Sequence, residues 1–278
     1  FLKSRKVYLD HYQVIQLYMA MGGIPHYLKE IKPGLSAAQN IDQICFGKNG
    51  LLRDEFAKLY PALFENANNH IAVIRALASK WKGLTRNEIV SISHLADGGG
   101  MSRILAELIE SGFVTMYMPF GKKKKDSLYR LTDEYSLFFI HFIEKLHKPG
   151  DNIWLKYSRL PQWKSWSGFA FESICMKHSS NIKHALGISG IYSEESAYIF
   201  KGDKNNDGFQ IDLLIDRNDA VINVCEMKFY SGEFAIDKSY AAKLRNKINK
   251  FKELSGTNKH IMLTVISSFG LVKNNHSL

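Results

Sequence analysis

Residues 211–230 of the chain, IDLLIDRNDAVINVCEMKFY, decide which fold its last third adopts. Two runs rich in Ile, Leu and Val flank the polar segment at positions 217–219, which predicts two paired strands joined by a turn. Asp212 interrupts the first run, and Glu226 and Lys228 interrupt the second. Strands apolar enough to lie inside a sheet therefore carry two carboxylates and an ammonium group.

The face on which these charges lie depends on how the two strands pair. Side chains alternate between faces along a strand, so Glu226 and Lys228 share one face. A turn of two or four residues would leave Asp212 on the other face. A loop of three or five residues, or a bulge, would bring it to their side. A solvated outer face would explain each charge singly, whereas convergence of all three would make a site.

Convergence of the carboxylates would create a metal site. Two carboxylates a few Å apart raise each other's proton affinity unless a cation lies between them. Oxygen ligands of this kind suit Mg²⁺ (or Mn²⁺), which binds through one or two carboxylates and keeps several waters. We therefore expect Asp212 and Glu226 to be metal ligands. Lys228 would orient or deprotonate a water nucleophile, or stabilise charge on a phosphate.

The composition of the chain favours a polyanionic partner. Lys and Arg number 37 against 27 Asp and Glu, a formal charge of +10. A surplus of this size is typical of proteins that bind nucleic acid, and less often of those that bind anionic membranes. We therefore expect nucleic acid as the first candidate partner, and the resemblances described below make it DNA.

The cysteines and the apolar runs indicate the cellular compartment that the chain occupies. Cys45, Cys175 and Cys225 are far apart in apolar surroundings, which predicts buried free thiols in a reducing compartment. No apolar run reaches the roughly 18 residues of a membrane span, so we expect no membrane partner. The first residue is Phe1 and not Met, and no signal-peptide pattern follows it, so we expect a cytoplasmic chain that begins inside a longer protein.

The first segment, residues 1–64, has the apolar periodicity of a helical bundle. Its MGGIPHYL stretch at positions 21–28 contains Gly22 and Gly23, which predict the end of one helix. Pro25 suits the first turn of the next helix.

The second segment, residues 65–148, predicts three helices and two strands. Thr85 and Glu88 have the spacing of a capping box at the start of the second helix. The two strands flank the basic stretch GKKKKD at positions 121–126. This pattern resembles a winged helix-turn-helix domain. The resemblance implies a third helix in the major groove and a wing on the DNA backbone.

The winged-helix resemblance implies contacts to nucleic acid. Arg103 lies on the expected third helix, and the wing supplies Lys122, Lys123, Lys124 and Lys125. Glu107 and Glu110 on the same helix repel phosphates, and winged helices also serve as protein-docking modules. Both alternatives stay open for this segment.

The third segment, residues 149–278, predicts a long helix, strands, the opening hairpin, a basic helix and a final strand. Asp212 with Glu226-Met227-Lys228 resembles the motif of the PD-(D/E)XK nuclease superfamily, in which Asp ends one strand and Glu-x-Lys lies on the next. The resemblance implies a restriction-endonuclease-like α/β domain with a mixed sheet. Pro is absent before Asp212.

The same resemblance extends beyond the motif. In many members an acidic residue on the first helix completes the metal site, and Glu172 matches that position. The helix after Glu-x-Lys commonly adds basic groups. Here these are Lys243, Arg245 and Lys247. We expect Glu172 with the catalytic and metal residues, and the basic side chains on nucleic acid.

The order of the three segments resembles the C-terminal half of archaeal-type AAA-family ATPases, with GGIPHYL in the helical lid. The resemblance implies an ATPase domain that binds ATP and through which the protein would form a homo-oligomer. No GxxxxGK[ST] motif occurs in the 278 residues, so that domain would precede them.

Two functions follow from these patterns in an α+β chain of several domains. One is Mg²⁺-dependent hydrolysis of DNA phosphodiester bonds at Asp212, Glu226, Lys228 and Glu172. The other is a non-catalytic DNA-binding or protein-docking module that the upstream ATPase regulates.

Overall fold

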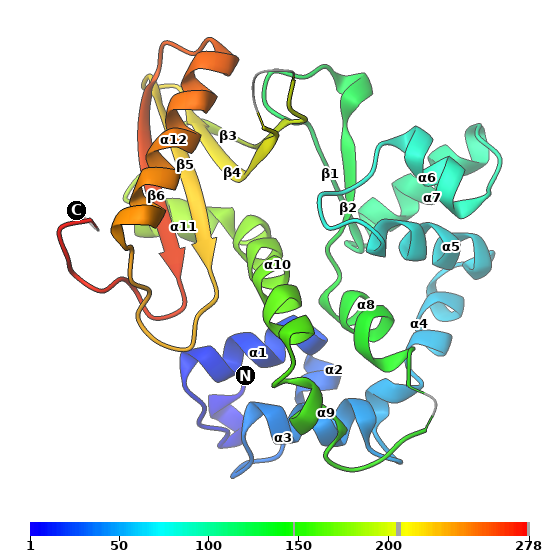
Figure 1. Ribbon diagram of the computed structural model, residues 1–278. Helices are drawn as coiled ribbons and strands as arrows, with labels where there is room; N and C mark the ends of the chain where they lie inside the picture. The colour runs from blue at the N-terminus through cyan, green and yellow to red at the C-terminus, as the bar shows by residue number, and fades with distance from the viewer. Residues whose placement is uncertain (147, 204–206, 277–278) are drawn as a thin grey trace. The chain divides into compact units, whose positions relative to one another are not determined.

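The computed structural model describes residues 1–146, 148–203 and 207–276 (Figure 1). The chain forms two compact units. Unit 1 contains Phe1–Met116 and Leu128–Ala170, and unit 2 contains Tyr117–Ser127 and Phe171–Leu278. The loop that carries the lysine-rich stretch therefore belongs to the same unit as the hairpin of residues 211–230.

The N-terminal part of unit 1 is helical, as the apolar periodicity predicts. Asp10 caps the first long helix by accepting from the backbone N–H of Gln13, and Gly22 ends it at φ +65°. Ser36 and Gln39 form a capping box at a third helix. The elements are η1 (Lys3–Arg5), α1 (His11–Met21), α2 (Pro25–Leu28), α3 (Ala37–Ile41), η2 (Asp42–Phe46), η3 (Leu51–Arg53) and α4 (Phe56–Leu63).

Three helices and a two-stranded sheet follow in unit 1. The capping box predicted at Thr85 and Glu88 is confirmed, with the reciprocal side-chain and backbone bonds both present. The elements are α5 (Ala67–Ala78), α6 (Arg86–Ser93), α7 (Gly99–Glu110), β1 (Val114–Tyr117) and β2 (Leu128–Leu131). The 3-10 turn η4 (Lys124–Asp126) lies in the loop between the two strands.

An aromatic cluster forms part of the core of unit 1. The ring of Trp154 packs edge-on against Phe138, Phe142 and Trp163 at centroid distances of 4.9–5.2 Å. Asp42 accepts hydrogen bonds from the backbone N–H groups of Asn152 and Trp154. The elements around the cluster are α8 (Glu134–Phe138), η5 (Phe139–Ile143), α9 (Ile153–Tyr157) and α10 (Pro161–Lys177).

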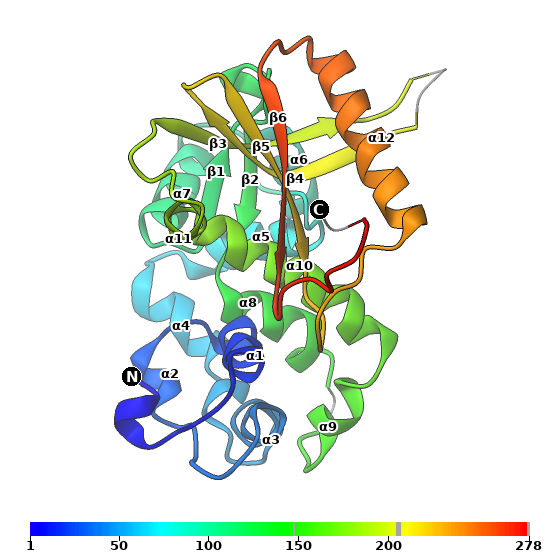
Figure 2. The ribbon, with the colours of Figure 1, turned by 90° about the vertical axis from the view of Figure 1, so that its left-hand side faces the viewer.

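Unit 2 is built on a four-stranded mixed sheet in the order β3-β4-β5-β6. The first two pairings are antiparallel, and β5 and β6 are parallel because α12 crosses over between them. Figure 2 shows the sheet with α12 along it. The elements are α11 (Ser179–Ala185), β3 (Ser193–Phe200), β4 (Phe209–Arg217), β5 (Val221–Lys228), α12 (Lys238–Ser255) and β6 (His260–Ser267). An α+β chain with a mixed sheet is confirmed.

The hairpin between β4 and β5 has a three-residue loop. Arg217 ends β4 and Val221 begins β5, so residues 218–220 form the loop. Ala220 has φ +64°, the left-handed residue that loops of this length require. Leu213 pairs with Cys225 at the end of this ladder, so Asp212 and Glu226 are the next residues along β4 and β5.

A bulge interrupts β4 at Asp212. On the β3 side, Ser196 pairs with Leu214 and Tyr198 with Ile211. One residue of β3 thus lies opposite two residues of β4, Asp212 and Leu213. Bulges of this kind occur beside active sites, where they redirect a side chain. The bulge also breaks the strict alternation that the sequence pattern assumes.

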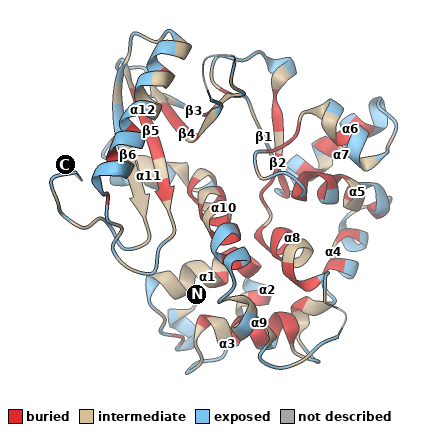
Figure 3. Ribbon diagram, in the orientation of Figure 1, coloured by how far each residue is buried: buried red, intermediate tan, exposed pale blue. Residues whose placement is uncertain are grey.

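Helix α12 covers one face of the sheet. Leu214, Ile222 and Val224 pack with Phe251 of α12 in a buried cluster, and the buried residues of the sheet concentrate on β4 and β5 (Figure 3). On the other side, the ring of Phe171 in α10 lies 5.6 Å from that of Phe229. The sheet therefore carries a helix against each face.

The loop between β1 and β2 is fixed to the sheet of unit 2. The backbone N–H of Phe120 donates to the carbonyl of Ala197 in β3 at 2.7 Å. Its ring packs edge-on against Phe251 at 5.6 Å. Two anchors thus hold the lysine-rich tip to this unit.

Among the helices of the described residues, none combines the length and apolar character that a membrane span requires.

Candidate functional site

Glu226 and Lys228 form an ion pair at the carboxyl end of β5. The Lys228 Nζ lies 2.8 Å from Glu226 Oε1. The two residues are two positions apart on a strand, so their side chains leave the same face. The Glu226 side chain is 12% exposed, so the carboxylate is largely withdrawn from water and needs a partner.

Helix α12 supplies two further partners of Glu226. The Lys247 Nζ lies 2.8 Å from Oε2, and the Tyr240 hydroxyl donates to Oε1 at 2.5 Å. The Lys228 ammonium also lies 5.4 Å from the centre of the Tyr240 ring. We call Glu226, Lys228, Tyr240 and Lys247 the Glu226 cluster. It contains one carboxylate and two ammonium groups, a net charge of +1.

The electrostatics of the cluster keep Glu226 and Lys228 charged and Tyr240 in its hydroxyl form at neutral pH. Burial raises the pKa of Glu226, but attraction to Lys247 and Lys228 outweighs it and lowers that pKa to about 2. Burial alone would lower the pKa of Lys228. The attraction to Glu226 raises this pKa by a larger amount, so it lies above its usual value. Burial and the bond to Glu226 raise the pKa of Tyr240 to about 12.

Asp212 lies in the bulge, one residue beyond the last pair of β4 with β5. Its Oδ1 accepts from the Gln210 side-chain amide at 2.6 Å. The contacts of Glu226 are with Lys228, Lys247 and Tyr240. The backbone therefore brings the two predicted metal ligands to neighbouring strands, each one residue from the pair of Leu213 with Cys225.

Glu172 lies on α10, one helical turn before Cys175. Its carboxylate is close enough to influence the pKa of this thiol. Burial is the largest cause that raises the pKa of Cys175 to about 12, followed by the charges of Cys225 and Glu172. Cys45, Cys175 and Cys225 are buried free thiols, as predicted.

A Mg²⁺ site needs oxygen ligands, of which one or two are commonly carboxylates of the protein. Within residues 1–146, 148–203 and 207–276, no group of three or more His, Cys, Asp or Glu side chains is placed to hold a metal ion. A cage made by Glu172, Asp212 and Glu226 together is thus not found. Ammonium groups stand beside both oxygens of Glu226, so a metal ion bound to this carboxylate stays a prediction.

The predicted basic contacts of unit 2 differ in their exposure. Lys243 and Arg245 are exposed on α12, whereas Lys247 is half-buried and bound to Glu226. The four wing lysines, Lys122 to Lys125, are all exposed. The wing and the outer side of α12 therefore offer free ammonium groups within one compact unit.

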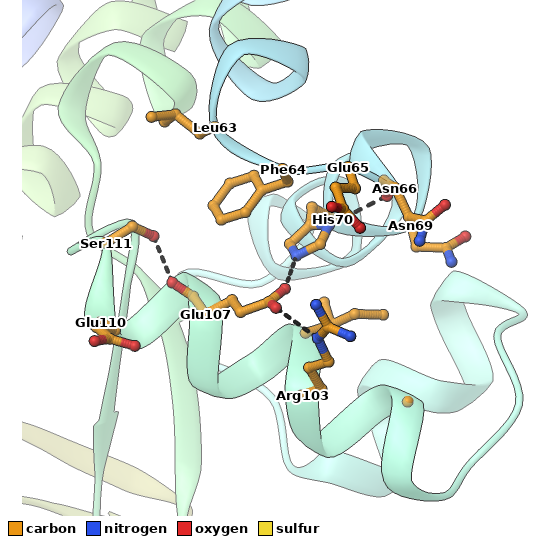
Figure 4. A pocket seen from close by; sticks show the side chains of 12 residues that line it. Leu63, Phe64, Glu65, Asn66, Asn69, His70, Arg103, Glu107, Glu110 and Ser111 are labelled. Carbon is orange, nitrogen blue, oxygen red and sulfur yellow. Dashed lines mark hydrogen bonds and ion pairs between the residues drawn. The ribbon is translucent and has the colours of Figure 1, made fainter.

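Arg103 of α7 lines a cavity of about 540 Å³ in unit 1 (Figure 4). Its Nε lies 2.7 Å from Glu107 Oε1, and Glu107 Oε2 lies 2.7 Å from His70 Nε2. The ring of Phe64 stacks on His70 at 4.1 Å. Glu110 also lines the cavity. Arg103 is thus bound to the Glu107 carboxylate of its own helix, and its contact with nucleic acid stays a prediction.

Tyr240 is the member of the cluster that the sequence did not reveal. It lies seven residues before Lys247, a spacing of two turns that puts both on one helix face. That spacing is visible in the sequence, but the docking of this face on Glu226 is not.

Comparisons of the chain with family models, with curated proteins and with solved structures found no match.

Proposed function

We propose that unit 2 binds nucleic acid and hydrolyses its phosphodiester bonds with Mg²⁺, with the Glu226–Lys228 pair at the reaction centre. The observation that carries the proposal is this ion pair at the carboxyl end of β5, in a mixed sheet with a helix on each face and with Asp212 on the neighbouring strand. Ligands of open α/β sheets bind beyond the carboxyl ends of the strands.

Glu226, Asp212 and Lys228 have different roles in the proposed reaction. Glu226 provides one carboxylate ligand, and Asp212 is the candidate for a second. Lys228 positions the attacking water or stabilises the charge that develops on the phosphate. When bound, the metal supplies Lewis-acid activation of water.

The PD-(D/E)XK resemblance supports the proposal at the level of the fold. That family has a helix, a mixed sheet and a second helix, and unit 2 contains the last part of α10 from Phe171 onward, four strands and α12 in a matching order. The three helices and two strands of residues 67–131 likewise support a winged-helix assignment. Control by an ATPase domain, and oligomers formed through it, belong to the same proposal.

The basic groups of unit 2 supply the binding surface. Lys243, Arg245 and the wing lysines are exposed, and the chain has a formal charge of +10. Ammonium and guanidinium groups that contact phosphates release counter-ions, which gives affinity without sequence preference.

The second candidate is a DNA-binding or protein-docking module without catalysis. One observation favours it: both oxygens of Glu226 already accept from groups of the protein. Such a cluster is also what a carboxylate retained only for structure would form.

A cleavage assay separates the two functions. Duplex DNA is incubated with the protein and Mg²⁺ or Mn²⁺, and the wild type is compared with Asp212→Ala and with an EDTA control. The nuclease predicts metal-dependent cleavage that Asp212→Ala abolishes while DNA binding persists. Binding without cleavage in either metal would support the module.

A further inference from the structure

The two edge strands of the sheet in unit 2 differ in how they are protected. In the order β3-β4-β5-β6, the outer strands are β3 and β6 (Figure 1). β3 carries Glu194 and Glu195, and the bulge interrupts its pairing with β4. The carbonyl of Ala197 in β3 also accepts from the backbone N–H of Phe120. Charges, bulges and covering loops keep an edge strand from pairing with other chains, so the edge at β3 is protected.

β6 lacks these devices over the residues that the structure describes. Its sequence, HIMLTVIS, contains no Asp, Glu, Lys, Arg or Pro. It pairs with β5 over eight consecutive residues without a register shift. Among the described strands, β5 is its one neighbour in the sheet. A regular apolar edge strand of this length is a template for pairing with another chain.

The side chains of β6 are incompletely covered on both faces of the sheet. The structure describes all eight residues of the strand, and none of them is buried. Met262 is 46% exposed and Leu263 is 39% exposed. Because adjacent residues of a strand point to opposite faces, each face of the sheet has one of these apolar side chains open to solvent. A further strand beside β6 would cover both.

The backbone of β6 directs donors and acceptors at the free edge. The N–H groups of His260 and Ser268 donate to the carbonyls of Ala220 and Lys228, so these two residues face the β5 side. Backbone groups alternate in direction along a paired strand, so every second residue between them faces away from β5. These residues are Ile261, Leu263, Val265 and Ser267. Another β-strand supplies complementary groups at the same spacing.

The side chains of β6 suit a second copy of the same strand. When identical strands pair antiparallel about a two-fold axis, each strand meets its own sequence, so a charge would be set close to its own like charge. β6 carries no such charge. With the axis at Thr264, Leu263 of one copy lies beside Val265 of the second copy. Met262 likewise lies beside Ile266 of the second copy, so apolar side chains meet on both faces.

We propose that β6 is the interface of a homodimer, in which it pairs antiparallel with β6 of a second copy. The two four-stranded sheets then form one continuous sheet. One strand from each copy makes an interface at the small end of those in specific complexes, so we expect weak association with a Kd of about 10 μM. The dimer does not depend on the hydrolysis proposed for the Glu226 cluster.

Sedimentation equilibrium of the whole chain, from about 1 to 100 μM, tests this dimer. The mass should rise with concentration from 31.7 kDa toward twice that value. Leu263→Lys should weaken the dimer about tenfold or more, because it sets an ammonium group of each copy at the paired edge. The matched control is Tyr192→Lys, which adds the same charge at an exposed apolar residue next to β3 and should dimerise like the wild type.

Leu263→Pro tests the backbone contact directly. Proline removes an N–H that points away from β5, so the ladder within the chain is kept while one hydrogen bond to the second copy is lost. This variant should also dimerise about tenfold more weakly, or less tightly still, than the wild type. Circular dichroism and Tm at low concentration establish that each variant is folded, and Leu263→Lys carries the test alone if the proline variant is not.

Three results would overturn the dimer. One is a wild-type chain that stays monomeric up to about 100 μM, which would leave the edge to a different partner. Another is a folded Leu263→Lys or Leu263→Pro variant that dimerises as tightly as the wild type, which would place the interface elsewhere. The third is an equal loss of dimer in Leu263→Lys and Tyr192→Lys, which would make net charge and not β6 the cause.

Discussion

At the scale of the residue, Glu226 shows how burial and pairing set the state of one side chain. A carboxylate with 12% exposure would favour its neutral form if it were alone. Lys228, Lys247 and Tyr240 reverse that preference, so the group is ionised over the whole neutral range. The sequence pointed to Glu226 and Lys228 through their spacing. It did not reveal their partners on α12, because those depend on how a distant helix docks.

Glu226→Gln should destabilise unit 2 at pH 7 by about 3 kcal/mol, because two ammonium groups lose their counter-charge. The folded-state pKa of Glu226 is depressed from 4.5 to about 2. Its contribution is therefore present above pH 4.5 and is lost as the pH falls toward 2. Urea unfolding at pH 7 and pH 3 measures both effects.

Glu253→Gln, at an exposed position of α12, is the control for this variant. It should shift stability by less than about 0.5 kcal/mol. Equal stability of the two variants at pH 7 would show that the Glu226 cluster contributes nothing to folding.

At the scale of the element, the sequence predicted the strands, the helix on each side of them and the capping box at Thr85. These depend on local pattern: apolar runs, turn residues and cap spacing. The bulge at Asp212 was not predictable, because it arises from the pairing of β4 with β3. The anchoring of the lysine-rich loop to unit 2 was not predictable either, since it depends on the contact of Phe120 with Phe251.

Ala220→Gly should raise the stability of the hairpin. Ala220 adopts φ +64°, a conformation that costs a residue with a Cβ roughly 1–2 kcal/mol. Glycine removes that cost, but it makes the unfolded chain more flexible, which lowers the free energy of unfolding by about 0.5–1 kcal/mol. We therefore expect the free energy of unfolding to rise by up to about 1 kcal/mol. Thermal unfolding measures it, and Ala220→Val, which is β-branched, should lower the Tm instead.

Phe120→Ala should loosen the tip of the loop between β1 and β2. The variant loses the ring contact with Phe251 while the backbone bond to Ala197 is retained. Trypsin should then cleave at Lys122–Lys125 about tenfold faster, which corresponds to about 1.4 kcal/mol of local stability. Met118→Ala, at an exposed position of the same loop, should cleave at the wild-type rate. Equal cleavage rates of the two variants would show that the Phe120 ring does not anchor the loop.

At the scale of the whole molecule, the excess positive charge is divided between the two units, and only unit 2 combines it with the Glu226 cluster. The wing lysines belong to unit 2 although the strands that lead to them belong to unit 1. In unit 1, Arg103 is bound to Glu107 beside an acidic cavity. We therefore assign the main nucleic-acid contacts to the wing and to α12.

Replacing Lys122 to Lys125 with Ala should weaken DNA binding equally for all sequences. Each phosphate contact contributes about 0.9 to the slope of log K against log salt, so the slope should fall by up to about 3.6. Filter binding at salt concentrations from about 50 to 200 mM measures this slope. The control replaces four exposed lysines of unit 1, Lys3, Lys6, Lys29 and Lys58, with the same loss of charge. If both variants lower the slope equally, net charge and not the wing governs binding.

The central claim is that the Glu226–Lys228 pair is the reaction centre for phosphodiester hydrolysis. The most direct measurement is the rate of supercoiled-plasmid nicking in Mn²⁺ for two matched pairs of variants on the same chain. Glu226→Gln and Lys228→Met should lose about 100-fold or more of the wild-type rate, as expected when a metal ligand or a charge-stabilising group is removed. Glu253→Gln and Lys252→Met, both at exposed positions of α12, should keep it. Nicking by folded Glu226→Gln at the wild-type rate, or no metal-dependent nicking by the wild type, would contradict the account.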